Sequence, residues 1–309
     1  MIVNDDTSVD TATEIGHGPK TVICLPGWFG SSTGWGQGFV DTLDRERLRY
    51  EFMDYRGYGE RRGSGGPYTI DQIAADVLEL ADDLGVESFS LVGHSMGGSA
   101  IQRVLALAPE RVECIVGVTP VPASGTPFDA EGRSLFEAAA ADDSARQAII
   151  DITTGKRLSY VWIDKLVRHS RARSDQEAFA AYFEAWADTD HAAEVPGDRV
   201  PALAIVGEHD PAITEQVVRD SWCALHPSSQ VIVLRNAGHY PMFETPIRLA
   251  TVIEEFIEAQ HAADKDRPLV ATTGAVRDGR PTARERVPER VPGPVREDLP
   301  NPDQAHTPS

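Results

Sequence analysis

The sequence predicts an α/β fold, in which a mostly parallel, doubly wound sheet carries a helical insertion. Short, nearly continuous apolar runs alternate with amphipathic stretches, as is typical of strands that helices cover on both faces. This alternation stops between residues 122 and 198, where Ala-rich and charged stretches indicate helices and no strand. The predicted strands are residues 21–25, 50–54, 88–93, 112–118, 202–206 and 231–234.

Local signals place the helices between these strands. The clearest helix spans residues 69–84, where Thr69 and Gln72 form a capping-box pattern and apolar residues recur on one face. Gly85 follows at the position where the helix should end. Further helices are expected to begin at Ser95, at Thr214 and near Ile247.

Composition divides the chain into three parts. Residues 1–121 and 199–261 form the predicted sheet domain, and residues 122–198 form a helical lid over it. From residue 262 to 309 there is no aromatic residue, and 8 of the 21 prolines fall there. Such a segment buries too little apolar surface to offset its ordering entropy, so we predict a disordered tail.

Charge and targeting signals limit the partners. The 29 basic and 48 acidic residues give a net charge of -19, which opposes binding to nucleic acids and to anionic membranes. We find neither a secretory signal nor a membrane-spanning run, and expect a soluble, cytoplasmic monomer or homodimer that acts on a small molecule. Cys24, Cys114 and Cys223 are widely spaced, which predicts no structural metal.

The strongest chemical motif is Gly-His-Ser-Met-Gly at residues 93–97, where an apolar strand runs directly into a helical stretch. Gly93 and Gly97 allow the close approach of strand and helix that exposes Ser95 on a tight turn. We therefore predict Ser95 as a nucleophile. The same turn directs the N–H of Met96 at a developing oxyanion, near the positive end of the helix dipole.

A nucleophilic serine needs a base, and the base needs a partner that orients it. Asp210 follows the apolar strand at residues 202–206, and we prefer it as this partner to its neighbours Glu208 and His209. His239 follows the last strand on a loop that Gly238 lets turn back toward the sheet, and it is the predicted base. The chain order Ser, Asp, His fits this type of turn.

A second oxyanion donor and a pocket are expected near Ser95. The glycine-rich loop at residues 25–32 offers the N–H of Trp28 as the donor. The predicted pocket residues are Phe29, Tyr160, Trp162 and Tyr240, although Phe29 fits a core position equally well. Other aromatic residues of the lid could line the same pocket or pack its helices on one another: Phe128, Phe136, Tyr182, Phe183 and Trp186.

Together, residues 26–28, 54–59 and 93–97 and the pair Asp210 and His239 resemble the α/β-hydrolase superfamily, in its lid-bearing branch of serine esterases, lactonases and perhydrolases. The resemblance covers roughly residues 20–260. It implies two-step acyl transfer through an acyl-enzyme, without cofactor or metal. Two features depart from the family pattern: Pro26 stands where many relatives have histidine, and the amino-terminal region, which usually forms two strands, is short and polar.

The resemblance and the aromatic lid predict a hydrolase for a small or medium apolar carboxylic ester or lactone. The same three residues also serve carbon-carbon bond hydrolases and perhydrolases or other acyltransferases. A hypothesis from a different class is a ligand receptor built on this fold, in which hydrolysis is slow or lost.

Overall fold

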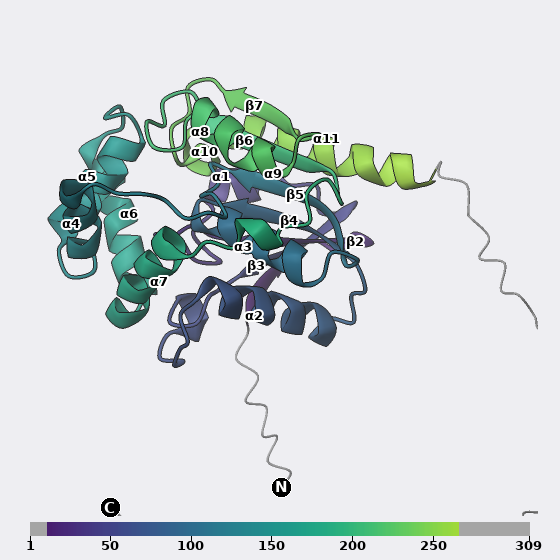
Figure 1. The fold of residues 1–309 in the computed structure, drawn as a ribbon, viewed down its shortest axis with the longest axis horizontal. Coiled ribbons are helices and arrows are strands. Elements are labelled where there is room, and N and C mark those ends of the chain that lie inside the picture. The colour runs from purple at the N-terminus through teal and green to yellow at the C-terminus, as the bar shows by residue number, and fades with distance from the viewer. Residues whose placement is uncertain (1–10, 266–309) are drawn as a thin grey trace, which may run out of the picture. The chain divides into compact units, whose positions relative to one another are not determined.

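The computed structural model describes residues 11–265, with side chains for residues 11–261, and its centre is a seven-stranded sheet (Figure 1). The strand order is β1-β3-β2-β4-β5-β6-β7. Strand β1 runs antiparallel to β3 and every other neighbouring pair is parallel, which confirms the predicted fold class. The strands are β1 (Ala12–Ile15), β2 (Lys20–Leu25), β3 (Leu48–Met53), β4 (Phe89–His94), β5 (Val112–Val118), β6 (Ala202–Gly207) and β7 (Gln230–Leu234).

Helices connect these strands, and α3 packs along β4 and β5 while α2 packs on α3. Helix α2 begins as expected, because the hydroxyl of Thr69 accepts a hydrogen bond from the N–H of Gln72 at 3.1 Å. The Gln72 side chain donates to Asp76 instead of completing the capping box. The helices outside the insertion are α1 (Gln37–Val40), α2 (Ile70–Asp83), α3 (Met96–Leu107), α8 (Glu215–Asp220), α9 (Trp222–Leu225), α10 (Pro241–Glu244) and α11 (Pro246–Lys265), with a 3-10 turn, η1 (Gly59–Arg61).

A block of helices lies between β5 and β6, and Figure 1 shows it gathered at one end of the sheet. One of its members, α7, packs on the loop that follows β3, where the side chain of Tyr182 contacts Tyr55 and Tyr58. We call this block, together with the loops that precede and join its helices between β5 and β6, the helical insertion. Its elements are α4 (Ala130–Ala138), α5 (Asp143–Thr153), α6 (Tyr160–Arg173), α7 (Gln176–Asp188) and the 3-10 turn η2 (Ala192–Glu194).

The structure differs from the prediction near both ends of the described chain. Strand β1 was not predicted, because only its pairing with β3 makes this short and largely exposed segment regular. Helix α11 continues to Lys265, past the predicted start of the tail at residue 262, since alanine and lysine favour helix even where aromatic residues end. The remainder of the predicted tail lies outside the described residues. No helix in the described part of the chain has the length and apolar character needed to span a bilayer.

The strand order places a crevice where catalytic residues can gather. From β2 the chain moves to β3 on one side, then crosses to β4 and continues to β7 on the other. The carboxyl ends of β2 and β4 therefore flank the point where the winding reverses, which is where open α/β sheets bind ligands. Leu25 pairs with Gly93 at this edge, so the loop that begins at Pro26 starts beside the end of β4 and the turn at Ser95.

A buried ion-pair cluster fixes the turn that follows β3. The carboxylate of Asp76 on α2 accepts hydrogen bonds from Arg56 at 2.8 Å, from Arg61 at 2.7 Å and from Gln72 at 2.6 Å. Burial raises the pKa of Asp76, but these hydrogen bonds outweigh burial and leave its pKa below the ordinary value. The ionised carboxylate is therefore the form that stabilises this turn.

We expect Asp76→Asn to lower the free energy of unfolding by about 2 to 4 kcal/mol, since a cluster that loses its anion leaves Arg61 buried without a charge partner. Because the pKa of Asp76 is depressed on folding, its contribution is present above the unfolded value and is lost as pH falls through the folded value. Urea unfolding followed by tryptophan fluorescence, at pH 7 and in a series from pH 4 downward through the ordinary carboxyl pKa, measures both effects. A change below about 0.5 kcal/mol at pH 7 would contradict this role.

Candidate active site

Ser95 lies on a strained turn between β4 and α3. Its φ of 52° and ψ of -116° fall in a region that residues with a side chain rarely adopt. The turn is possible because glycines flank it: a Cβ at Gly93 would overlap the carbonyl of Gly97, and one at Gly97 would overlap that of Leu25. The N–H of Ser95 donates to the carbonyl of Val118 at 3.0 Å, which ties the turn to β5.

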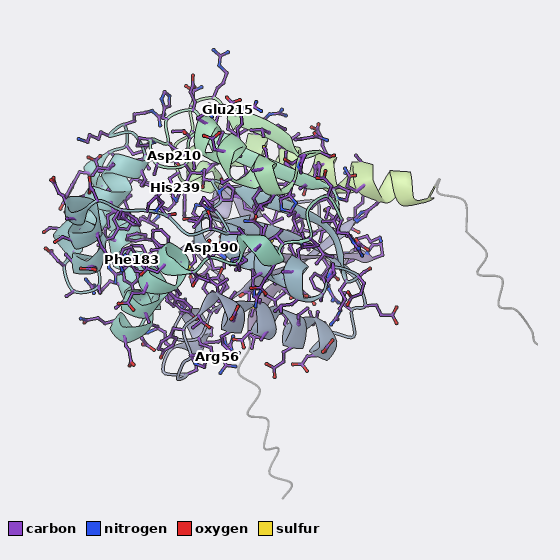
Figure 2. All side chains as sticks on the ribbon, in the orientation of Figure 1. Arg56, Phe183, Asp190, Asp210, Glu215 and His239 are labelled. Atoms are coloured by element: carbon purple, nitrogen blue, oxygen red, sulfur yellow. The ribbon has the colours of Figure 1, made fainter. Side chains whose placement is uncertain are left out.

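The structure brings Asp210, His239 and Ser95 into one hydrogen-bonded row. Asp210 Oδ2 lies 2.6 Å from Nδ1 of His239, and Nε2 of His239 lies 2.9 Å from Oγ of Ser95. The other carboxylate oxygen of Asp210 accepts the N–H groups of Ala212 and Ile213 at 2.9 and 3.1 Å. Figure 2 shows Asp210 and His239 close together at the end of the sheet that faces the helical insertion.

The loop that carries His239 is fixed by the insertion and by a buried carboxylate. The N–H of His239 donates to the carbonyl of Thr153, the last residue of α5, at 3.2 Å. The carboxylate of Glu244 accepts the N–H groups of Gly238 and Tyr240 at 2.8 and 3.1 Å. Arg157 of the insertion pairs with this carboxylate at 3.0 Å. Hydrogen bonds to Thr153 and to Glu244 therefore fix the backbone that carries the imidazole of His239.

His94 forms a hydrogen bond to the backbone of the loop that carries His239. Its Nε2 lies 2.8 Å from the carbonyl of His239, which can only accept, so this nitrogen carries the proton and donates. The hydroxyl of Thr119 donates to the same carbonyl at 3.2 Å. Burial, followed by the neighbouring His239, lowers the pKa of His94 to about 3. His94 is therefore an uncharged hydrogen-bond donor at neutral pH.

The loop that follows β2 approaches Ser95 closely and is held by two tyrosines. A Cβ at Gly27 would lie 3.0 Å from the Cβ of Ser95, so only glycine leaves room here. The hydroxyl of Tyr55 donates to the carbonyl of Pro26 at 2.7 Å, and that of Tyr58 donates to the carbonyl of Trp28 at 3.0 Å. These contacts fix the backbone of the loop on both sides of Gly27.

The peptide groups that carry the N–H of Trp28 and of Met96 are both fixed through their carbonyl ends. The carbonyl of Gly27 accepts the N–H of Gly30 at 2.9 Å, and that of Ser95 accepts the N–H of Gly98 at 2.7 Å. Because a peptide unit is planar, the N–H on its other side points the opposite way. Among the described residues, neither the N–H of Trp28 nor that of Met96 finds a hydrogen-bond acceptor.

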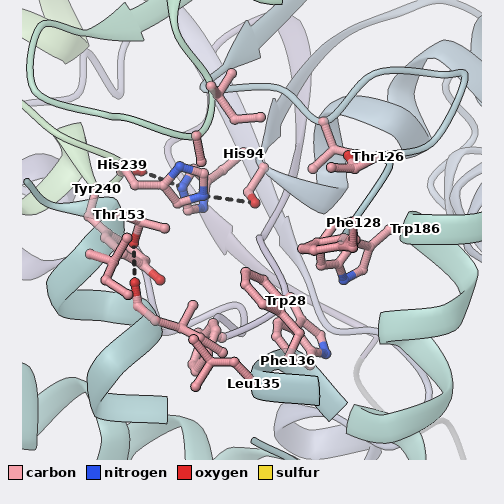
Figure 3. A pocket seen from close by; sticks show the side chains of 17 residues that line it. Trp28, His94, Thr126, Phe128, Leu135, Phe136, Thr153, Trp186, His239 and Tyr240 are labelled. Carbon is pink, nitrogen blue, oxygen red and sulfur yellow. Dashed lines mark hydrogen bonds between the residues drawn. The ribbon is translucent and has the colours of Figure 1, made fainter. Parts of the chain in front are cut away.

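A cavity of about 180 Å³ opens beside Ser95 and His239. Figure 3 shows His239 and Tyr240 on one side of it, Phe128 and Trp186 on the other. Two histidines, His94 and His239, line it, and among the described residues no Asp, Glu, Lys or Arg side chain does. The remaining lining is mostly apolar and comprises Trp28, Phe29, Val121, Thr126, Phe128, Leu135, Phe136, Ile149, Ile152, Thr153, Trp186, Ala212, Ile213 and Tyr240 together with Ser95. Within residues 11–261 no group of three or more His, Cys, Asp or Glu side chains is placed to hold a metal ion.

A family model described as the alpha/beta hydrolase fold matches residues 20–246, which is more than half of the chain. The chain belongs to the α/β-hydrolase fold family. The match spans every strand from β2 to β7 and includes Ser95, Asp210 and His239.

Relatives of this α/β hydrolase carry several activities in their names. It is 30% identical over 232 residues to an N-formylmaleamate deformylase of Pseudomonas putida, which covers 71% of this chain and 81% of that protein. It is 27% identical over 195 residues to a 3-oxoadipate enol-lactonase of Acinetobacter baylyi, covering 62% and 72% of the two chains. The structure of a hydrolase from Oleispira antarctica superposes with a TM-score of 0.71 at 19% identity, covering 82% and 96%.

Two of the predicted pocket residues lie elsewhere. Tyr160 is the first residue of α6 and is 66% exposed, with its hydroxyl 3.3 Å from the amide of Gln147. Trp162 packs against Tyr240 and Phe243 and does not line the cavity. The prediction was wrong for both, because the start of α6 faces solvent and the outer side of Tyr240. Phe29 and Tyr240 do line the cavity.

The sequence reasoning missed Glu244, which contacts the loop of His239. Its signal was present, since Tyr240 is followed by a proline and, three residues later, a glutamate, a pattern typical of a helix start. It also left open which aromatic residues of the insertion face the site. The structure places Phe128, Phe136 and Trp186 in the cavity wall.

We expect His94 to stay neutral from pH 8 down to about pH 4, since burial lowers its pKa to about 3. NMR titration of the imidazole signals, assigned with His94→Asn, measures this. In the unfolded chain this histidine binds a proton near pH 6.5, whereas in the folded protein it does not. The contribution of His94 to the free energy of unfolding therefore falls as pH drops from about 6.5 toward 3. A His94 titration midpoint above pH 5 would refute the assignment.

Proposed function

We propose that this α/β hydrolase is a serine hydrolase that cleaves small or medium apolar carboxylic esters or lactones. Ser95 is the nucleophile, His239 its base and Asp210 the residue that orients the base. The single observation that carries the proposal is the row of two hydrogen bonds, 2.6 and 2.9 Å long, from Asp210 through His239 to Ser95. An intact row also favours an enzyme over a ligand receptor on the same fold.

Acyl transfer then proceeds in two steps. As the Oγ of Ser95 bonds to the substrate carbonyl carbon, its proton passes to Nε2 of His239. The tetrahedral intermediate collapses, the bond to the leaving alcohol breaks, and His239 returns the proton to that alcohol. Water attacks the resulting ester of Ser95 in the same way, with His239 first taking and then returning a proton, and the carboxylic acid is released.

The N–H groups of Met96 and Trp28 are the proposed oxyanion donors. Each belongs to a peptide unit whose carbonyl is already bonded, and the backbone of Gly27 approaches the Cβ of Ser95. Met96 is also the first residue of α3, where the helix dipole favours negative charge. Donors fixed before the reaction need no reorganisation as the charge develops, and one such donor is typically worth about 2.7 to 4 kcal/mol.

The cavity wall supports an uncharged, apolar substrate. It holds aromatic and aliphatic side chains, and its two basic groups, His94 and His239, already have partners. A carboxylate on the substrate would lose its hydration there without gaining a cation. The helical insertion supplies Phe128, Phe136 and Trp186 to this wall, and we propose that it acts as the lid of the site.

We expect Ser95→Ala to reduce hydrolysis of p-nitrophenyl butyrate at least about 10⁴-fold and to abolish labelling by a fluorophosphonate probe. Loss of the nucleophile removes the covalent step, whereas Ser144→Ala, at an exposed position on α5, should leave both unchanged. The rate of p-nitrophenol release, followed by absorbance, measures hydrolysis. Mass spectrometry of the protein measures covalent labelling. Wild-type protein that neither turns over esters nor takes the label would defeat the proposal.

Among p-nitrophenyl esters, kcat/KM should rise about fourfold for each added methylene until the cavity is filled, because each buried methylene contributes about 0.8 kcal/mol. An ester of the same length that ends in a carboxylate should react at least about tenfold more slowly. A steady-state comparison of acetate, butyrate, hexanoate and mono-succinate esters tests this. Preference for the succinate ester would exclude an apolar substrate class.

A further inference from the structure

Arg146 is a buried cation within the helical insertion. It lies on α5 with no exposed surface, and its Nε donates to the carbonyl of Ala139 and its Nη1 to the hydroxyl of Ser170, both at 2.7 Å. No carboxylate within residues 11–261 forms an ion pair with it. Burial lowers the pKa of Arg146 to about 10, so the guanidinium is still charged at neutral pH.

The guanidinium stacks on an aromatic ring that contacts the loop after β2. Its central carbon lies 3.6 Å from the ring centre of Phe179 on α7. The same ring stacks on Trp28, with centres 4.1 Å apart and planes 24° from parallel. Two groups so close to one ring centre cannot share a face without overlapping. Phe179 therefore lies between Arg146 and Trp28.

Phe179 also binds Trp28 through its backbone. The indole N–H of Trp28 donates to the carbonyl of Phe179 at 2.7 Å, while the carbonyl of Trp28 accepts the hydroxyl of Tyr58. The side chain of Trp28 is thus held by α7, and its backbone by the turn after β3. A shift of Phe179 would move the peptide group whose N–H we assign to the oxyanion.

We propose that Arg146 is a positioning residue, which acts through Phe179 to fix the N–H of Trp28 in line with the developing oxyanion. This inference rests on the proposed function. A cation over an aromatic face is directional and contributes more when it is desolvated. An apolar side chain would fill the same space without fixing the plane of the Phe179 ring.

The alternative is that Arg146 only packs the insertion. That role would change stability and the shape of the cavity, but would alter binding of ground-state and transition-state analogues equally. A positioning role changes only interactions made in the transition state, so it lowers kcat and weakens analogues that carry an oxyanion. The two roles are therefore separable by measurement.

The decisive variant is Arg146→Met, with Arg171→Met as its matched control. Arg171 is an arginine of α6 that pairs with Asp143 and donates to the carbonyl of Ala140. Among the described residues it is not stacked on Phe179 and does not line the cavity. For p-nitrophenyl butyrate we expect kcat to fall about 10- to 100-fold in Arg146→Met, less than full loss of a donor. Binding of a butyl trifluoromethyl ketone, which forms a tetrahedral oxyanion with Ser95, should weaken by the same factor. Binding of the matching methyl ketone should change less than about threefold.

Phe179→Leu supplies the second test, because it removes the ring between the two residues and keeps the carbonyl that binds the indole. If Arg146 acts through this ring, Arg146→Met should have little further effect on kcat in the Phe179→Leu background. Full additivity of the two changes would overturn the proposal. So would a loss in Arg146→Met that is no larger than in Arg171→Met, or that weakens both ketones equally.

A readout without turnover separates this inference from the proposed function. Exchange of the backbone amide hydrogens of residues 27–30 should be faster in Arg146→Met than in wild type or Arg171→Met, whether or not any ester is cleaved. Unchanged exchange there would overturn the positioning role. Absence of wild-type esterase activity and probe labelling, with exchange altered as expected, would instead reject the oxyanion assignment.

Discussion

The site depends on a close backbone contact between β4, α3 and the loop after β2. Side chains at Gly93, Gly97 or Gly27 would collide with the backbone or with Ser95 and His94. Because these three positions lack a Cβ, Ser95 can adopt its positive φ and present its hydroxyl at the switch point of the sheet. Strain of this kind costs of order 1 to 3 kcal/mol, and the bonds between the turn and β5 help the fold to tolerate it. The loop of His239 and the loop after β2 both meet at this turn.

The helical insertion contributes backbone contacts to the site. Thr153 at the end of α5 accepts the N–H of His239, and Phe179 on α7 accepts the indole N–H of Trp28. One contact orients the proposed base and the other the proposed oxyanion loop. An insertion that moved away as one body would break both, so we infer that substrate entry needs only local rearrangement near the aromatic wall of the cavity. The contacts of α7 with the turn after β3 further restrict such movement.

Much of the sheet and of the proposed triad could be predicted from the sequence, because both follow from local patterns and chain order. Buried parallel strands are continuous apolar runs, and Ser95, Asp210 and His239 each follow one. Strand β1 could not be predicted this way, since its regularity comes from pairing with β3 rather than from its own pattern. The prediction for Tyr160 and Trp162 was wrong for a similar reason: whether α6 reaches the cavity depends on how the insertion packs, and local sequence patterns do not determine that.

The loop after β2, to which we assign an oxyanion donor, is held by contacts from the turn after β3. Proline precedes Gly27 in this loop, and the carbonyls of Pro26 and Trp28 accept hydrogen bonds from the hydroxyls of Tyr55 and Tyr58. Both tyrosines come from the turn after β3. The carbonyl of Gly27 is meanwhile bonded within the loop, so the peptide unit cannot rotate without breaking a hydrogen bond. A donor held in this way is oriented before substrate binds, and this preorganisation is what makes it effective against a charge that exists only in the transition state.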